Sequence, residues 1–399
     1  MSSLTWSPWN EVSPTVPPEV VKVSSPTYGR YLEEFHPGQV FTHPRGITLH
    51  AALAQDFATT FMESCPLYLN EEYPKLLGFE KQPVSPLMVL ATALSLGVQN
   101  ESEKAIAHLG YYDVCFPRVT YVGDTLRAMT RVIDKKVKAP GEPGIVHVQT
   151  IAMNQHSEVV VRYERKIMIP SNPVQEDRSA PVVLGVQPEF HWIDHPIIKL
   201  PENLAALSDS KMKSALAHWT SENTTFENFE VGQIIAHFNG RTVTDEHVNW
   251  TYKLGNTHPL HFDTVYTHSL PAPMGGAPVV YGGLVFSWIT GLASRDTTEN
   301  LIYDLGYTQG YHTQPTRTGD TLYAITRVLK KEDSHHPGVG ILTLQLIGLK
   351  NLNPADAIKR YGSQLFLKEN DKKKMGLEKI VEKNFEIERR VMIRKRSVI

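Results

Sequence analysis

Two polar side chains and two glycines in the second half of the chain could together add water to an unsaturated acyl thioester. Asn256 and His261 lie five residues apart in a loop that contains Pro259. A histidine can both take and give a proton, and an asparagine can hold a water through its amide. Gly282 and Gly283 begin an apolar run, and helix-start N–H groups with no side chain in front of them can stabilise a thioester oxygen that gains negative charge.

Each of these residues also has a purely structural interpretation. Asn256 could only cap a helix end, His261 could make a local hydrogen bond, and the glycines could allow tight helix packing. In this combination we expect His261 to be the acid/base and Asn256 to orient the water. The N–H groups of Gly282 and Gly283 would then form the oxyanion hole, and Tyr281, directly before them, would shape the acyl pocket.

Two helices must position these groups. The polar loop follows a short amphipathic segment that opens with Thr244, a helix-start residue, and closes at Gly255, a natural helix end. The glycine pair opens the apolar run 279–293, which has a counterpart at 84–98. Both runs are shorter than the roughly 20 residues that a membrane span needs, so we expect buried helices in a soluble protein.

An internal repeat organises the whole chain. Segments recur in the same order, 193 to 196 positions apart: FHPGQV at 35–40 and FEVGQI at 229–234, CPLY at 65–68 and HPLH at 258–261, LGY at 109–111 and 305–307, GDTL at 123–126 and 319–322, TRV at 130–132 and 326–328. Such a constant register indicates a duplicated unit. The GDT segments are typical of a turn that enters a strand.

Each copy is predicted to place one long apolar helix against an antiparallel sheet, an α+β arrangement. Strands are expected near 109–117, 123–135, 144–155 and 158–169 in the first copy. The segment YERKIMI at 163–169 matches IERRVMI at 387–393, now 224 positions on, so about 28 residues are inserted near 355–383 before the last strand. We expect this insert, with its charged and helix-prone part at 375–383, to lie on the surface.

The domain organisation follows from the repeat. Residues 1–28 are rich in Pro and Ser and are expected to form an extended arm. Residues 29–170 would form the N-terminal domain and 226–399 the C-terminal domain with its insert. Residues 171–225 would link them, Pro-rich at first and then helix-like around 204–218.

The segment GNTHPLH at 255–261 resembles the Gly-Asp-x-Asn-Pro-x-His motif of the MaoC-like hydratase and dehydratase family in its tandem, double hotdog arrangement. The resemblance covers about 30–170 and 225–395. It implies a sheet wrapped around a central helix in each half, a CoA thioester substrate, and His261 as the catalytic histidine. Asn256 stands where the family has Asp, which is a departure from the motif.

Within that family, three features are similar to the mesaconyl-CoA (2-methylfumaryl-CoA) hydratases: an Asn-Thr-x-x-x-His-Phe pattern, a Tyr-Gly-Gly helix start, and Gly-Asp-Thr in both halves. The resemblance implies reversible conversion of mesaconyl-CoA to β-methylmalyl-CoA. A general (R)-specific enoyl-CoA hydratase and a non-catalytic acyl-CoA-binding protein are the alternatives. If the acyl group carries its own carboxylate, Asn256 removes a repulsion that Asp would cause, since two like charges ~4 Å apart cost about 4 kcal/mol at an effective dielectric of 20.

The first copy is expected to be non-catalytic and to widen the pocket. It has Tyr68 where the second copy has His261, and its apolar helix begins VSPL at 84–87, without a glycine pair. Glu63, at the position of Asn256, could still act as an acid or base. We therefore leave its contribution open.

Composition excludes several other classes. A net charge of −2 gives no general attraction for nucleic acid or an anionic membrane. Cys65 and Cys115 are too few for a disulfide framework or a four-thiolate zinc site, and no signal peptide is visible, so we expect a cytoplasmic protein. No metal or cofactor is expected, the pair His335–His336 is typical of a hairpin loop, and a homodimer is plausible because hotdog sheet edges usually pair. Candidate cations for the CoA phosphates are Arg241, Arg317, Lys330 and Lys331, although a surface ion pair would explain any one of them better.

Overall fold

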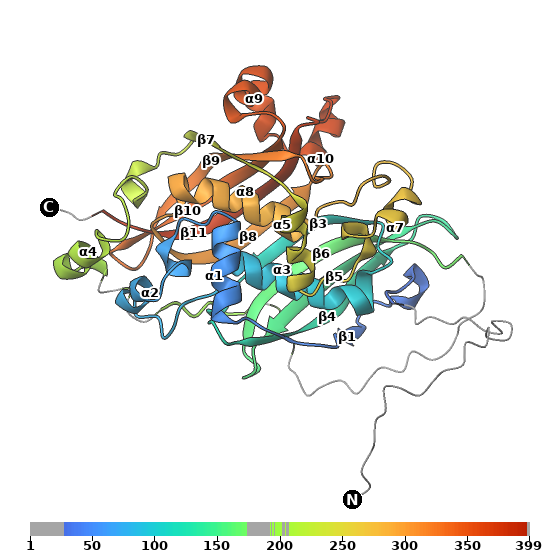
Figure 1. Cartoon of the computed structure of the whole chain (residues 1–399), viewed down its shortest axis with the longest axis horizontal. Coiled ribbons are helices and arrows are strands. Elements are labelled where there is room, and N and C mark those ends of the chain that lie inside the picture. Colours follow the sequence, from blue (N-terminus) through green and yellow to red (C-terminus); the bar gives the residue numbers. More distant parts are fainter. Residues whose placement is uncertain are drawn as a thin grey trace, which may run out of the picture.

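The computed structural model of the chain describes residues 28–173, 192, 194, 196–201, 204 and 207–396. Within these residues one antiparallel sheet of eleven strands runs through the molecule (Figure 1), in the order β1-β4-β5-β6-β3-β8-β11-β10-β9-β7, with β2 paired to β4. The strands of the first repeat are β1 (Val40–Thr42), β2 (Ile47–Thr48), β3 (Ala107–Cys115), β4 (Thr125–Lys136), β5 (Gly144–Met153) and β6 (Val159–Ile169). Those of the second are β7 (Ile234–Thr242), β8 (Leu301–His312), β9 (Thr321–Asp333), β10 (Val339–Lys350) and β11 (Lys383–Arg394).

The two repeats meet where β3 pairs with β8. Tyr111 lies opposite Gly310 and Val114 opposite Tyr307, so the pairing itself follows the two-fold relation of the repeats. Gly306 has a φ of +123°, and a Cβ there would come within 1.9 Å of the Val114 carbonyl oxygen. Only glycine allows this approach of the two central strands, which explains one of the repeated Leu-Gly-Tyr segments.

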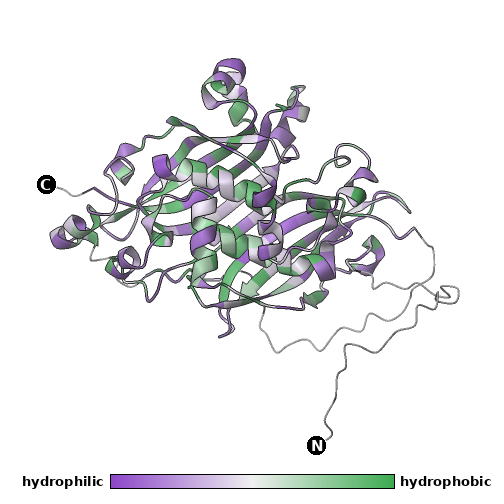
Figure 2. Cartoon of the chain, in the orientation of Figure 1, coloured by the Kyte–Doolittle hydropathy of each residue, from purple (hydrophilic) through white to green (hydrophobic). Residues whose placement is uncertain are grey.

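Two apolar helices lie next to each other against the sheet (Figure 1): α3 (Pro86–Gly97) and α8 (Gly282–Thr297). All residues from 87 to 97 and from 283 to 294 are buried. A helix that is apolar on every side is stable only in an interior, and Figure 2 shows apolar residues of both helices and of the strands gathered there. The sequence predictions of buried helices near 84–98 and 279–293 are therefore confirmed.

Shorter helices cover the loops and edges. They are α1 (Ala51–Thr60), α2 (Glu72–Leu76), α4 (Ser210–Leu216), α5 (Asp245–Val248), α6 (Trp250–Lys253), α7 (Thr264–His268), α9 (Pro354–Tyr361) and α10 (Glu369–Lys372). The predicted strands of the first copy agree with β3 to β6 within a few residues, and α4 is shorter than the helix predicted around 204–218. The predicted arm at 1–28, apart from Tyr28, and most of the Pro-rich start of the linker lie outside the described residues.

The insert between β10 and β11 differs from the prediction. Its α-helices, α9 and α10, precede residue 375, whereas residues 376–382 contain no helix and β11 begins at Lys383. The expected surface location is also wrong in part, because Glu369, Lys372 and Lys383 are buried. Glu369 lies 2.7 Å from the Lys372 ammonium and 3.5 Å from that of Lys383, so ion pairs offset the burial of these charges. Charged composition alone cannot reveal such pairing.

Among the residues that the structure describes, no helix is both long and apolar enough to cross a lipid bilayer.

Candidate active site

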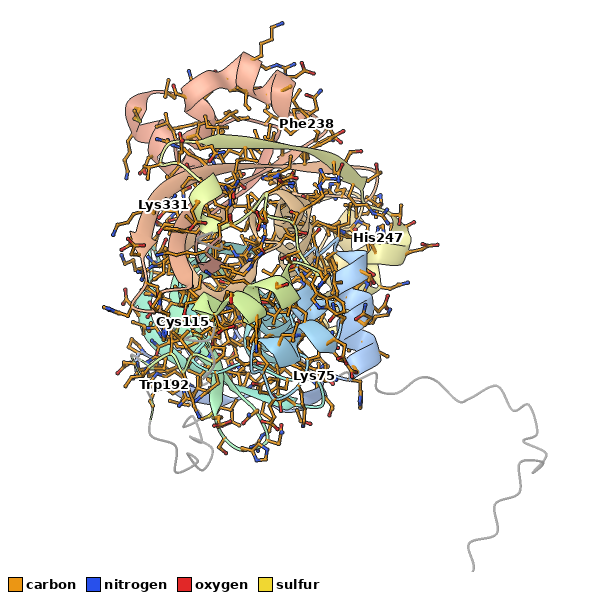
Figure 3. All side chains as sticks on the ribbon, turned by 90° about the vertical axis from the view of Figure 1, so that its left-hand side faces the viewer. Lys75, Cys115, Trp192, Phe238, His247 and Lys331 are labelled. Atoms are coloured by element: carbon orange, nitrogen blue, oxygen red, sulfur yellow. The ribbon has the colours of Figure 1, made fainter. Side chains whose placement is uncertain are left out.

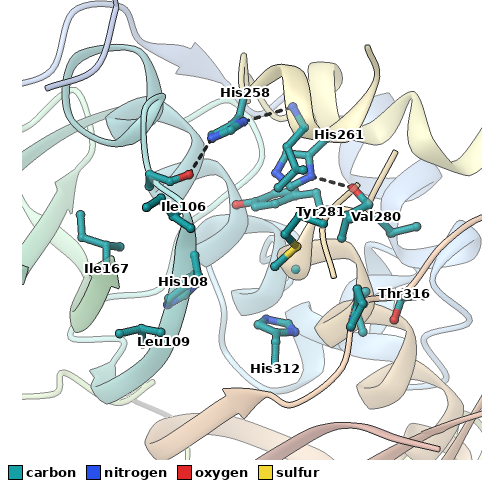
Figure 4. Close-up of a pocket in the computed structure, with 18 of the residues that line it drawn as sticks. Ile106, His108, Leu109, Ile167, His258, His261, Val280, Tyr281, His312 and Thr316 are labelled. Atoms are coloured by element: carbon teal, nitrogen blue, oxygen red, sulfur yellow. Dashed lines mark hydrogen bonds between the residues drawn. The ribbon is translucent and has the colours of Figure 1, made fainter. Parts of the chain in front are cut away.

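A cavity of about 440 Å³ lies between the two repeats (Figure 4). The first repeat contributes one wall, which includes Val98, His108 and Arg165. The second repeat contributes Asn256, His258, His261, Tyr281, Gly282 and His312. The predicted site residues, with the exception of Gly283, thus line one cavity, and the first repeat forms part of it.

Short capped helices hold the loop of Asn256 and His261 in place. The Thr244 hydroxyl and backbone N–H lie 3.0 and 3.1 Å from Nδ1 of His247, so that His247 caps the start of α5. Figure 3 labels the position of His247. The chain then passes through α6 and turns at Gly255, whose φ of +85° favours glycine. The predicted helix start and end are therefore confirmed, and the polar loop begins directly after the turn.

One ring nitrogen of His261 is held by a hydrogen bond, and the other has no hydrogen-bond partner among the residues that the structure describes. Its Nδ1 lies 2.8 Å from the backbone oxygen of Val279, which can only accept, so Nδ1 carries the proton (Figure 4). Burial, reinforced by the neighbouring His258, lowers the pKa of His261 to about 3. The ring is therefore neutral at pH 7 and Nε2 keeps a lone pair, which is the state that a general base requires.

The loop is also tied to the first repeat. Nε2 of His258 donates to the Ala105 carbonyl oxygen at 3.3 Å, and its Nδ1 accepts from the backbone N–H of Leu260 at 3.2 Å. The Thr257 hydroxyl donates to the Glu103 carboxylate at 2.8 Å. Because both ring nitrogens of His258 are engaged, we assign it a positioning role for its neighbour His261.

Asn256 is buried, and its amide oxygen bonds within the loop. Its Oδ1 accepts the backbone N–H of His258 at 2.9 Å, a bond of the loop itself that does not cap the end of α6. The Tyr281 hydroxyl accepts from the Ser95 hydroxyl at 3.4 Å. The Tyr281 hydroxyl in turn donates to the Ala91 carbonyl oxygen at 2.9 Å, and burial raises its pKa to about 12. Tyr281 is thus a neutral, fixed part of the pocket wall. A water that binds Asn256 must bond to the positions of the amide group that the His258 N–H leaves unused.

The two glycines differ in their surroundings. Both open α8, where the first N–H groups of a helix have no partner within the helix. Gly282 lines the cavity, and a Cβ there would come within 2.6 Å of Nε2 of His312. Gly283 does not line it; a Cβ there would lie 2.9 Å from the Tyr281 ring and 3.0 Å from Cβ of Ala91. The geometry favours the N–H of Gly282 as the oxyanion donor and gives Gly283 a packing role.

Besides His258, four ionisable lining residues escaped the sequence interpretation: His108, Arg165, His312 and Lys379. His312 lies 3.1 Å from the Tyr111 hydroxyl, and burial lowers the pKa of this histidine to about 4. Arg165 belongs to the repeated segment at 163–169, but its orientation toward the cavity depends on strand pairing. His108 precedes the repeated Leu-Gly-Tyr segment, so comparison of the repeats could have singled it out.

The corresponding region of the first repeat is nearly filled. Tyr68 stands in place of His261, and the cavity beside it has a volume of about 30 Å³. Helix α3 begins at Pro86, which has no N–H to donate. Glu63 accepts two backbone N–H groups of its own loop at 3.0 Å, and burial raises its pKa. These contacts give Glu63 a structural role in its loop and support the expectation that the first half is not catalytic.

The four cations suggested for the CoA phosphates are engaged elsewhere. Arg317 donates to the backbone oxygens of Pro273 and Gly275 at 3.0 Å, and Lys331 donates to that of Phe229 at 2.9 Å. Lys330 pairs with Glu332, and Arg241 contacts His247. The exposed Lys379 of the insert lines the cavity instead and is better placed to meet a phosphate.

No group of three or more metal-binding side chains occurs in the described part of the chain. His335 and His336 lie in the loop between β9 and β10, as predicted.

Comparisons with known proteins agree with this architecture. The family model described as mesaconyl-CoA hydratase matches residues 18–355. The chain is 29% identical over 305 residues to β-methylmalyl-CoA dehydratase of Chloroflexus aurantiacus, with 76% of this chain and 83% of the relative covered. It is 29% identical over 325 residues to mesaconyl-CoA hydratase of Cereibacter sphaeroides, with 81% and 90% covered.

Solved structures give the same picture. A MaoC domain protein dehydratase from Chloroflexus aurantiacus superposes with a TM-score of 0.75 at 25% identity, covering 94% of this chain and all of the other. A Mycobacterium tuberculosis protein described as having a double hotdog fold superposes with a TM-score of 0.68 at 19% identity, covering 92% and 98%. The expected α+β double hotdog fold is therefore confirmed. The chain belongs to the mesaconyl-CoA hydratase family, a group of hydro-lyases, and is built on the MaoC-like double hotdog fold.

Proposed function

We propose that the protein reversibly hydrates mesaconyl-CoA to β-methylmalyl-CoA, with His261 as the acid/base. The observation that carries this proposal is the neutral His261, whose Nδ1 is held by Val279 and whose Nε2 faces a cavity lined by the free N–H of a helix start. The names of the two curated relatives support the substrate pair. Both belong to proteins that align with most of this chain.

The reaction can be written with the residues of the cavity. Nε2 of His261 takes a proton from water, and the resulting hydroxide attacks the β carbon of the enoyl thioester. Electron density moves to the thioester oxygen, where the N–H of Gly282 at the start of α8 stabilises it. His261 then returns the proton to the α carbon, so the net change is the addition of one water. The amide of Asn256 would hold the attacking water.

The charge of the cavity supports a dicarboxylic acyl group. Among the described residues that line it, none is an Asp or Glu, and Arg165 and Lys379 are cationic. In mesaconyl-CoA the β carbon that receives the water carries the free carboxylate. An Asp at position 256 would therefore face a like charge, which the neutral Asn256 avoids.

A hydratase for uncharged enoyl chains is the second candidate, because apolar residues such as Leu94, Val98 and Ile167 also line the cavity. The loss of conjugated enoyl-thioester absorbance distinguishes the two when mesaconyl-CoA and crotonyl-CoA are compared. We expect the absorbance of mesaconyl-CoA to fall rapidly with the wild-type protein. The rate of this fall should decrease by about 10²- to 10⁴-fold in His261→Ala and change little in Tyr68→Phe. Turnover of crotonyl-CoA alone would favour the second candidate, and binding without turnover would favour an acyl-CoA-binding protein.

We further propose a cytoplasmic homodimer. Strand β7 forms one edge of the sheet, and Phe238 on it is 68% exposed (Figure 3). An exposed aromatic residue on an unpaired edge supports association with a second copy. Light scattering of the wild type and of Phe238→Asp would test this, and a monomer in both cases would refute the dimer.

A further inference from the structure

Arg165 is a buried cation in the wall of the active-site cavity. It lies on β6 and is 5% exposed. Both of its hydrogen bonds use Nη2, which donates to Glu101 at 2.8 Å and to the Ser102 hydroxyl at 3.1 Å. Its Nε is buried and has no hydrogen-bond partner among the described residues. A buried N–H of a charged group is costly to leave unpaired, so this donor indicates that a partner is missing.

In the second repeat, the equivalent arginine has a carboxylate as the partner of its Nε. The counterpart of Arg165 is Arg389, which donates through Nε and Nη2 to the Asp304 carboxylate at 2.9 and 2.8 Å. Asp304 lines the nearly filled cavity beside Tyr68, to which both repeats contribute. The same nitrogen that is unpaired in Arg165 thus holds a carboxylate in Arg389.

The difference arises at one position of the repeat. The residue before Leu-Gly-Tyr is Asp304 in the second copy and His108 in the first. Nε2 of His108 lies 3.0 Å from the Gly110 carbonyl oxygen, and burial lowers the pKa of this histidine well below its usual value. A neutral imidazole cannot act as the counter-ion that Asp304 provides. The open cavity therefore lacks the carboxylate that the closed one contains.

We propose that Arg165 binds the distal carboxylate of the acyl group, which takes the place that Asp304 occupies beside Arg389. This inference rests on the proposed function, because it requires a dicarboxylic acyl chain. Glu101, which is fully buried, holds Nη2 from outside the cavity lining, so the guanidinium is fixed before substrate arrives. Lys379 is exposed, which leaves Arg165 as the buried cation of the described lining.

This assignment makes Arg165 a specificity-determining residue. In a mesaconyl thioester the carboxylate is attached to the β carbon, so a carboxylate held by Arg165 fixes the position of the carbon that receives the water. A planar guanidinium also restricts the rotation of the carboxylate that it holds. The first repeat would then select the acyl group, while the second supplies His261.

Binding of unreactive analogues tests the inference separately from catalysis. The probes are 2-methylsuccinyl-CoA and 2-methylbutyryl-CoA, which differ in a carboxylate against a methyl group, with affinities measured by calorimetry. Wild type should prefer the former by roughly 100-fold, the size of effect seen when one partner of a buried charge pair is truncated. The variant His108→Asp should lose most of this preference, because Arg165 would then have the internal counter-ion that Arg389 has.

A second pocket variant and a matched control guard against loss of fold. Arg165→Met combined with Glu101→Gln removes both charges and should also abolish the preference. Arg389→Met combined with Asp304→Asn removes the equivalent pair beside the nearly filled cavity and should leave the preference intact. Unchanged preference in both pocket variants, or no preference in wild type, would overturn the inference. If wild type prefers the carboxylate but hydrates no mesaconyl-CoA, the proposed function fails and the inference stands.

Discussion

The substitution Asn256→Asp would test why a neutral amide lies in the same loop as His261, the proposed acid/base. The carboxylate could still accept the backbone N–H of His258, now at 2.9 Å from Oδ1. It would gain no proton from the Tyr281 hydroxyl, which already donates to the Ala91 carbonyl oxygen at 2.9 Å. The new charge would therefore be buried and only partly satisfied, facing a cavity that holds the substrate carboxylate.

The size of the effect follows from the separation of the two charges. At ~4 Å and an effective dielectric of 20 they repel by about 4 kcal/mol, which corresponds to roughly a 10³-fold decrease in kcat/KM for mesaconyl-CoA. Tiglyl-CoA has a methyl group in place of the carboxylate and would not experience this repulsion. The ratio of kcat/KM for mesaconyl-CoA to that for tiglyl-CoA should accordingly fall by about the same factor.

Enoyl-thioester absorbance measures both rates, and thermal unfolding checks that Asn256→Asp is folded. Burial raises the pKa of a carboxyl group, so the selective loss should diminish as the pH falls and the new carboxyl takes up a proton. Asn256→Ala is the control, because it removes the amide without adding a charge and should slow both substrates alike. A ratio that stays constant or rises in Asn256→Asp would refute the charge argument.

Three further results are expected. In the hydration direction kcat/KM should stay flat between about pH 8 and pH 5, because burial lowers the pKa of His261 to about 3 and the base form persists; a tenfold loss by pH 5.5 would contradict the lowered pKa. Gly282→Ala should lower kcat by roughly 10²- to 10³-fold, because its Cβ would meet His312 in the cavity, whereas Gly283→Ala, which crowds buried packing, should mainly lower the unfolding temperature. Glu369→Gln should destabilise the fold by about 3 to 5 kcal/mol in chemical denaturation, because Lys372 would lose its buried partner, and an unchanged midpoint would show that this ion pair contributes nothing.

The sequence was most informative where a pattern repeats or a chemical type is rare. The spacing of the repeated segments predicted two equivalent halves, and the wholly apolar runs predicted the buried helices α3 and α8. Gly255 predicted the turn that starts the loop of Asn256 and His261. These features depend on local chemistry, which a single chain records directly.

The remaining features depend on which residues meet in space. The role proposed for Arg165 depends on its unpaired Nε and on the comparison with Arg389. Neither observation follows from the sequence of one strand. The sequence does not distinguish Gly282 from Gly283, yet the orientation of α8 places only Gly282 at the cavity. The insert was predicted to be exposed because it is charged, but Glu369 compensates two lysines in the interior.

The fusion of the two repeats, which meet where β3 pairs with β8, also affects how the sequence of this protein can evolve. In an assembly of two identical single-repeat chains, every substitution would appear twice, once in each pocket. Covalent fusion removes that constraint, so position 108 can vary while position 304 keeps the ion pair beside the nearly filled cavity. Selection, or a protein engineer, can therefore alter the cavity wall around Arg165 in one half while leaving the loop of Asn256 and His261 in the other half and the structural core unchanged.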